Sequence, residues 1–165
     1  MKEIQNWLTQ LDQATHEWLG ELGEDLTDPE LMWQAFPNGH SIGALLVHIA
    51  EVEAYWLHHI ACGEPYQDRE GEVLKGEIDQ FGIRWPTPPT YPLHFYKALL
   101  ATTREKTKRL IGALESPNHT ATRVRRDGTA QEFTLSWLMT HVIVHEAYHG
   151  GQAVLLVLMQ RKANE

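Results

Sequence analysis

The sequence has little of what secreted or membrane-spanning proteins carry. Its 165 residues contain one cysteine, Cys62, which excludes an internal disulfide and any CxxC zinc or redox motif. No apolar run approaches the roughly 18 residues that a membrane span requires, and the first residues, MKEIQNWLTQLDQ, carry charged and polar side chains throughout. We therefore expect a soluble, unsecreted, cytoplasmic protein that binds no membrane.

Basic residues are also scarce. The 14 lysines and arginines face 22 aspartates and glutamates, which gives a net charge of -8. This balance disfavours general binding to nucleic acid, because such binding depends on basic side chains that neutralise phosphates. The two basic clusters, Arg104 to Arg109 and Arg123 to Arg126, are interrupted by Glu105 or adjoin a turn, so we expect solvated faces.

The length of 165 residues, with 42% hydrophobic and 22% charged residues, is typical of one globular domain, here 1–165. A domain of this size should bury roughly two thirds of its unfolded surface, so it needs no metal merely to fold. A metal site, if present, would therefore be functional.

Hydrophobic periodicity predicts an all-α protein, a four-helix bundle with helices over 3–22, 42–61, 92–114 and 135–161. The stretch 64–91 contains several prolines and no sustained periodicity, so we interpret it as a long crossover between helices two and three. That length allows these two helices to run parallel. In the third helix, Leu99, Leu110 and Leu114 are expected to face inward.

Shorter elements are predicted between the long helices. Asp28-Pro29-Glu30 starts a short helix that Pro37 ends, and Ser41 and Thr134 can cap the long helices that follow them. Alternating residues around Asp127-Gly128 indicate a small hairpin over 120–133, because Asp-Gly tolerates the positive φ of a tight turn.

Ten histidines stand out, and three of them share the core faces of two helices. On the last helix, steps of three and four residues pass through His145, His149 and Gln152, and the same steps on the second helix pass through His48. Histidines four residues apart lie one helical turn apart, so both can bind one ion. Buried without a partner, such polar atoms would cost about 1 to 3 kcal/mol each.

Spacing alone leaves alternatives open. A lone His48 could be a hydrogen-bonded core residue, and a slightly rotated helix would use His141 and His145 as the pair. Otherwise, we expect His141 to orient a ligand or substrate. His59 lies too far along its helix from His48 to share an ion. The remaining histidines are expected in surface or capping roles: His16, His40, His58, His94 and His119.

The residues from His145 to His149 also spell H-E-x-x-H, the metalloprotease motif in which the glutamate is a general base. The extended motif requires glycine and a third histidine where this chain has Gln152 and Leu155. A peptidase is thus a minority interpretation.

Two stretches resemble the DinB-like superfamily of metal-binding four-helix bundles. They are Gly39 to Trp56 (GHSIGALLVHIAEVEAYW) and His141 to Gln152 (HVIVHEAYHGGQ). The resemblance implies metal ligands at His48, His145 and His149, with zinc, nickel or a similar divalent ion. The family often has arginine where this chain has Gly150, which puts in doubt any anion contact inferred from relatives.

The resemblance also implies chemistry, because characterised members look like transferases and isomerases that use low-molecular-weight thiols such as bacillithiol or mycothiol. We expect a metal-dependent S-transferase acting on a small electrophile. The alternatives are a hydrolase with Glu146 or Glu51 as base, a non-catalytic metal- or ligand-binding protein, and a helical interaction domain. Further weak catalytic candidates are His141 and Gln152. A homodimer is left open, and the substrate is not readable from the sequence.

Overall fold

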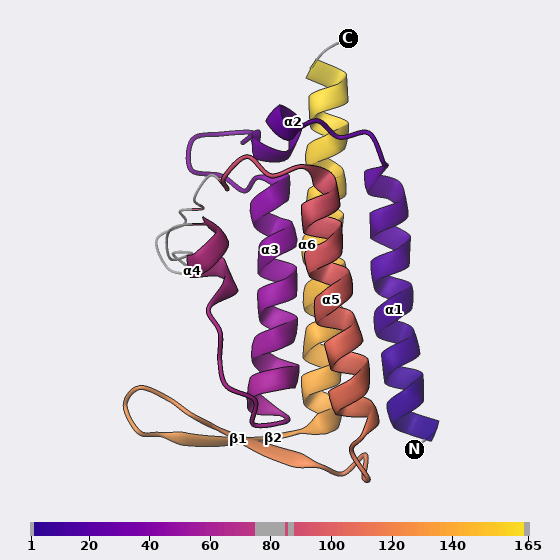
Figure 1. Cartoon of the computed structure of the whole chain (residues 1–165), viewed down its shortest axis with the longest axis vertical. Helices are drawn as coiled ribbons and strands as arrows, with labels where there is room; N and C mark the ends of the chain where they lie inside the picture. Colours follow the sequence, from indigo (N-terminus) through magenta and orange to yellow (C-terminus); the bar gives the residue numbers. More distant parts are fainter. Residues whose placement is uncertain (1, 75–84, 86–87, 164–165) are drawn as a thin grey trace.

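Four long helices dominate the fold and lie side by side in the computed structural model, which describes residues 2–74, 85 and 88–163 (Figure 1). The long helices are α1 (Lys2–Leu22), α3 (Ile42–Glu53), α5 (Leu93–Gly112) and α6 (Leu135–Ala163). A π-helical segment, η1 (Ala54–Ile60), continues α3, and α2 (Asp28–Met32) and α4 (Arg69–Leu74) are short. The described chain is therefore mostly helical, as the hydrophobic periodicity predicted.

The long helices pack through α1 on α6 and through α3 on both α5 and α6. Both α3 and α5 run from top to bottom in Figure 1, whereas α1 and α6 run upward. The parallel course of α3 and α5 agrees with the long connection between them, which returns the chain to the upper end.

That connection contains a helix which the sequence analysis missed. Helix α4 begins after Asp68, whose Oδ1 accepts a hydrogen bond from the Gly71 backbone N–H at 2.7 Å, the arrangement of an N-cap. The Arg69 backbone N–H donates to Glu51 on α3 at 3.0 Å. The prolines of this stretch suggested irregular structure, so the short helix was not predicted. Residues 75–84, 86 and 87 of the expected crossover lie outside the described residues.

The interior consists of apolar faces at helical spacing. On α1 the periodicity predicted an inward face that also included Trp7 and Leu19, which are half-buried. The buried residues are Ile4, Leu8, Leu11, Trp18 and Leu22. Full burial of such side chains contributes about 1.5 to 3 kcal/mol each. On α5 the expected inward residues Leu99, Leu110 and Leu114 are only half-buried. The buried face is instead partly polar and comprises Leu93, Tyr96, Leu100, Thr103, Arg104, Thr107 and Ile111.

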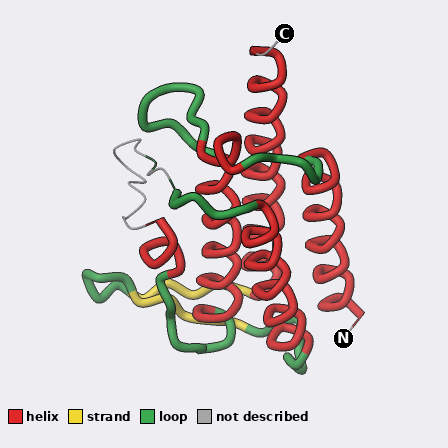
Figure 2. The backbone as a smooth tube through the Cα atoms, turned by 45° about the horizontal axis from the view of Figure 1, so that its top comes forward, coloured by secondary structure: helices red, strands yellow, loops and turns green. Residues whose placement is uncertain are grey.

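The predicted hairpin is present as β1 (Thr120–Val124) and β2 (Ala130–Thr134), an antiparallel pair that contacts η1 through β1. These are the yellow strands of Figure 2. The turn of the hairpin places Gly128 at a φ of +82°, where residues with a side chain are strained. The Thr134 hydroxyl accepts a hydrogen bond from the Trp137 backbone N–H at 3.2 Å and caps α6. The hairpin therefore fixes where α6 begins.

Helix α6 corrects the expectation that no segment is long and apolar enough for a membrane. By length and composition alone, Leu135–Lys162 meets that test among the described residues. Its inner side, however, packs against α1 and α3 and buries Glu146 in contact with a guanidinium. The core helix of a soluble protein passes the same test, so this feature is weak evidence for a membrane.

Candidate metal centre

Three histidine side chains meet between α3 and α6. His48 comes from α3, while His145 and His149 lie one turn apart on α6, and one nitrogen from each lies within 4.8 Å of the others. The Nε2 atoms of His48 and His145 are 3.0 Å apart. The structure thus brings together the three histidines that the resemblance to the DinB-like superfamily implied, in a group that could hold a metal ion.

Two further side chains form hydrogen bonds to the Nδ1 atoms of His48 and His149. His48 Nδ1 bonds a Glu70 carboxylate oxygen from α4, and His149 Nδ1–H donates to Gln152 Oε1 at 2.7 Å. With Nδ1 protonated in both rings, each Nε2 keeps its lone pair for an ion. Divalent metal sites typically contain imidazole nitrogens as ligands, with a carboxylate or amide group hydrogen-bonded to the other nitrogen of the ring. The residues present therefore fit such an ion.

Burial keeps the pair on α6 neutral. Removal from water, together with the neighbouring imidazoles, lowers the pKa of His145 to about 2 and that of His149 to about 4. Both rings are therefore uncharged at pH 7. Neutral imidazole is the form that coordinates a metal.

His141 stands apart from the three. Its ring stacks on Trp137 at a centroid distance of 4.8 Å and meets the edge of Trp56 at 5.1 Å. The His145 ring is 6.2 Å away, and the metal-binding group does not include His141. The helix orientation thus favours the pair His145 and His149 over the pair His141 and His145.

Aromatic side chains enclose the cluster. The Trp85 ring meets the His48 ring edge to face at 5.0 Å and contacts the His40 ring at a tilt at 4.0 Å. The Tyr148 and His149 rings also meet edge to face, at 4.9 Å. His40, expected in a surface or capping role, is half-buried here and lies 6.3 Å from His149, measured between ring centroids. No periodicity places His40 or Trp85, because both lie outside the helices.

Glu146 points to the other side of α6, although it follows His145 directly. Its Oε2 accepts a hydrogen bond from Arg104 Nη2 at 2.7 Å, and its Oε1 accepts one from the Thr15 hydroxyl. Burial raises the pKa of Glu146 to about 7, against the opposing effect of the Arg104 charge. The carboxyl is thus engaged between α1 and α5, away from the histidines.

Glu51, the other candidate base, lies one turn beyond His48. It is buried between α3 and α4, where it accepts the Arg69 backbone N–H. Burial raises its pKa above the ordinary value. Glu51 therefore anchors α4, the helix that carries Glu70.

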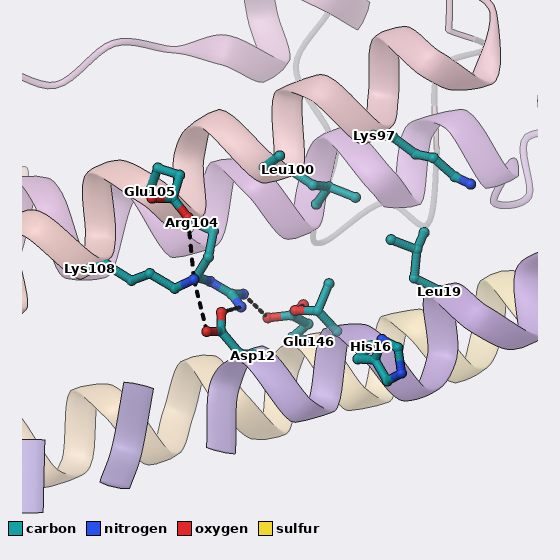
Figure 3. Close-up of a pocket in the computed structure, with 11 residues that line it drawn as sticks. Asp12, His16, Leu19, Lys97, Leu100, Arg104, Glu105, Lys108 and Glu146 are labelled. Carbon is teal, nitrogen blue, oxygen red and sulfur yellow. Dashed lines mark hydrogen bonds and ion pairs between the residues drawn. The ribbon is translucent and has the colours of Figure 1, made fainter. Parts of the chain in front are cut away.

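Arg104 corrects the expectation of a solvated basic face. It is only 7% exposed, and its guanidinium bonds Glu53, Glu146 and Asp12 at 2.7 to 3.0 Å. Figure 3 shows Arg104 with Asp12 and Glu146. His58, another residue expected at the surface, is also buried and bonds the Thr107 hydroxyl at 2.8 Å. A charged residue within a polar helix gives no sequence signal that distinguishes this inward position from a solvated one.

A cavity of about 420 Å³ lies over this charge network, between α1 and α5 (Figure 3). Its lining includes Asp12, Lys97, Arg104 and Glu146, but none of the three clustered histidines. Asp12 and Glu146 pair with Arg104 in this lining. Because none of the three histidines lines it, the cavity is separate from the candidate metal centre.

The helical architecture and the histidine group together define a DinB-like protein whose three histidines could hold a metal ion. The sequence matches the mycothiol-S-transferase family over residues 7–156, and the chain belongs to that family. A search of curated proteins gives no match.

The structure gives a reason for glycine at position 150, where DinB-like proteins often have arginine. A Cβ at this position would lie 2.3 Å from Trp18 Cγ on α1, so the helices meet too closely for a side chain. The position at which this chain differs from those proteins therefore lies on the side of α6 that faces α1.

Proposed function

We propose that this protein is a metal-dependent S-transferase that joins a low-molecular-weight thiol to a small electrophile. The match to the mycothiol-S-transferase family over nearly the whole chain supports the reaction class, and mycothiol is the thiol that the family name indicates. The single structural observation that carries the proposal is the group of three histidine nitrogens within 4.8 Å of one another.

In this proposal His48, His145 and His149 hold one divalent ion, zinc or nickel, through their Nε2 atoms. When bound, such an ion lowers the pKa of a coordinated thiol and so supplies a thiolate at neutral pH. Glu70 and Gln152 fix the rings of His48 and His149 through the hydrogen bonds at their Nδ1 atoms. Gln152 is therefore a positioning residue here rather than a catalytic one.

The aromatic side chains around the histidines would shape the binding surface for the electrophile. Trp85 contacts the ring of His48, and His141 lies beside the histidine cluster on α6. We propose that His141 contacts substrate rather than metal, because its ring stacks on Trp137 beside the cluster.

Hydrolysis is less well supported. The hydrolase alternative assigned Glu146 or Glu51 as the general base for a metal-bound water. Glu146 bonds Arg104 and Thr15, while Glu51 bonds the backbone of α4. Both carboxylates thus have structural partners, which favours the transferase over the hydrolase.

The proposal also covers the domain organisation and the cellular location of the protein. We propose one DinB-like four-helix-bundle domain over 1–165 and a cytoplasmic location, where low-molecular-weight thiols are kept reduced. The packing of α1, α3, α5 and α6 supports the bundle.

The test combines metal analysis with turnover. Purified protein should bind one zinc or nickel ion per chain, and His48→Ala, His145→Ala and His149→Ala should each lose it. The matched control is His16→Ala, an exposed histidine on α1 that should retain the metal. Loaded protein should consume mycothiol with an alkyl or aryl halide faster than glutathione or cysteine.

Full metal affinity in His48→Ala would contradict the inter-helix site. Stoichiometric metal without turnover of any thiol would instead favour a protein that stores or senses metal.

A further inference from the structure

The outer face of α6 exposes large apolar side chains that no described part of this chain covers. Six of them are between 43 and 63% exposed: Trp137, Val144, Tyr148, Leu155, Leu158 and Met159. From Leu135 to Gln160 the helix contains one charged residue, Glu146, and its side chain is buried on the opposite side. We call the six exposed side chains the α6 face. Such a patch on a folded protein indicates an interaction surface.

The positions on this face repeat every seven residues. One series consists of Trp137, Val144, Gly151 and Leu158. A second series consists of Tyr148 and Leu155, which lie four residues after Val144 and Gly151. Apolar residues at this spacing form the seam along which one helix packs against another. The face therefore fits a helix better than it fits a lipid surface or a small molecule.

We propose that a second copy of this chain covers the α6 face, with the two α6 helices antiparallel about a two-fold axis between Tyr148 and Gly151. A two-fold contact must be self-complementary. About this axis, Tyr148 of each copy would meet Gly151 of the other, where open space lies within 4 Å of the position that a Cβ would occupy. Val144 would likewise meet Leu155.

The antiparallel direction follows from the ends of the face. In a parallel pair, Lys162 would meet its own copy, which brings like charges together, and Gly151 would face Gly151 across a gap. In the antiparallel pair, Lys162 meets the exposed ring of Trp137, a favourable cation–π pairing. Large side chains then oppose small ones along the seam.

The apolar area of the α6 face reaches the lower limit for a specific dimer interface. Since a fully exposed large side chain presents on the order of 150 to 250 Å², the six exposed fractions amount to roughly 600 Å² of apolar surface per copy. Two copies would bury roughly 1,200 Å², the lower limit of specific interfaces. An anionic membrane surface is disfavoured as an occupant because the net charge is -8.

The contact would also border the candidate metal centre, since Tyr148 touches His149 with a centroid distance of 4.9 Å. The proposal does not depend on the metal or on transferase activity. Its test therefore uses the full chain and measures mass rather than turnover.

Sedimentation equilibrium at micromolar concentration should give twice the chain mass of 18.9 kDa. Val144→Glu and Leu155→Glu should each raise the dissociation constant at least about 100-fold. The two-fold symmetry would bury two unpaired charges in the same interface, one from each copy. The matched control is Ala98→Glu on α5, which adds the same charge at an exposed helical position and should leave the dimer intact. Both target side chains are more than half exposed, so folding should survive, as circular dichroism can verify.

Cross-linking distinguishes the two directions. In a Cys62→Ser background, a mixture of Val144→Cys and Leu155→Cys chains should join with a short bis-maleimide as a 144–155 pair. Efficient 144–144 joining would overturn the antiparallel arrangement. A monomeric wild type at high micromolar concentration would overturn the dimer itself, as would unchanged association of Leu155→Glu. Monomers that sediment with anionic vesicles would assign the face to a membrane and overturn the proposal.

Discussion

Replacement of Arg104 by methionine should destabilise the fold more than any single surface change on α5. The guanidinium is buried with Glu53 and Glu146, whose side chains are 2% and 1% exposed, and it also reaches Asp12. Arg104→Met fills similar volume but leaves two buried carboxylates without a cation. Removing one partner of a buried ion pair costs about 3 to 5 kcal/mol, which is much of the stability of a domain this size.

The cost should depend on pH, and its sign follows from Glu146. Its pKa is raised from 4.5 to about 7 in the folded protein, so the folded state binds more protons than the unfolded state between these values. Stability therefore falls as pH rises through this window. The Arg104 charge opposes the upward shift, so its removal should raise the pKa of Glu146 further. The deficit of Arg104→Met should consequently be largest near pH 8 and smaller near pH 5, where the carboxyl is protonated.

The assay is urea unfolding followed by circular dichroism at pH 8 and pH 5, with wild type measured beside the variant. Lys108→Met is the matched control, since Lys108 pairs with Asp12 and Glu105 but is 38% exposed, and it should cost at most about 1 kcal/mol. Arg104→Met with Glu146→Gln should cost less than the sum of the single changes, because they share one interaction. A deficit for Arg104→Met below about 1 kcal/mol at pH 8 would refute the reasoning.

Three further predictions concern the histidines. Glu70→Gln should weaken metal affinity about 10- to 100-fold in calorimetric titration, because the carboxylate holds His48 through Nδ1; unchanged affinity would mean that α4 does not support the site. His141→Ala should keep the metal while altering KM or kcat, and complete metal loss would place this residue among the ligands. The buried ring of His58 has its pKa lowered to about 4, so the unfolded state binds more protons between about pH 4 and 6.5 and stability falls as pH drops through that window. His58→Gln should therefore reduce the pH dependence of chelator-treated protein near pH 5 by about one proton, and an unchanged slope would contradict a neutral buried His58.

The sequence by itself determined most of the local structure. Apolar spacing located the four long helices, because an amphipathic helix must turn one face inward, and Asp127-Gly128 located the hairpin through its backbone preference. The same spacing placed His48 and the histidines of the last helix on core faces, since residues three or four apart share one helix face. It left the pairs His141 with His145 and His145 with His149 open, and the resemblance to the DinB-like superfamily favoured the second pair, which the structure groups with His48. These features depend on neighbours within about one heptad, so a single sequence contains them.

Only the tertiary structure decided which polar residues are buried and which partners they have. Glu70 reaches His48 across 22 residues, and Arg104 reaches Glu53 and Glu146 from a helix whose charged pattern suggested solvent. The π-helical segment η1 lies within the single helix predicted over 42–61, and none of the spacing rules foresaw it. A charged side chain is stable either in water or beside a buried partner, and local sequence does not distinguish the two. The choice is made when separate helices pack, because only then is the partner within reach.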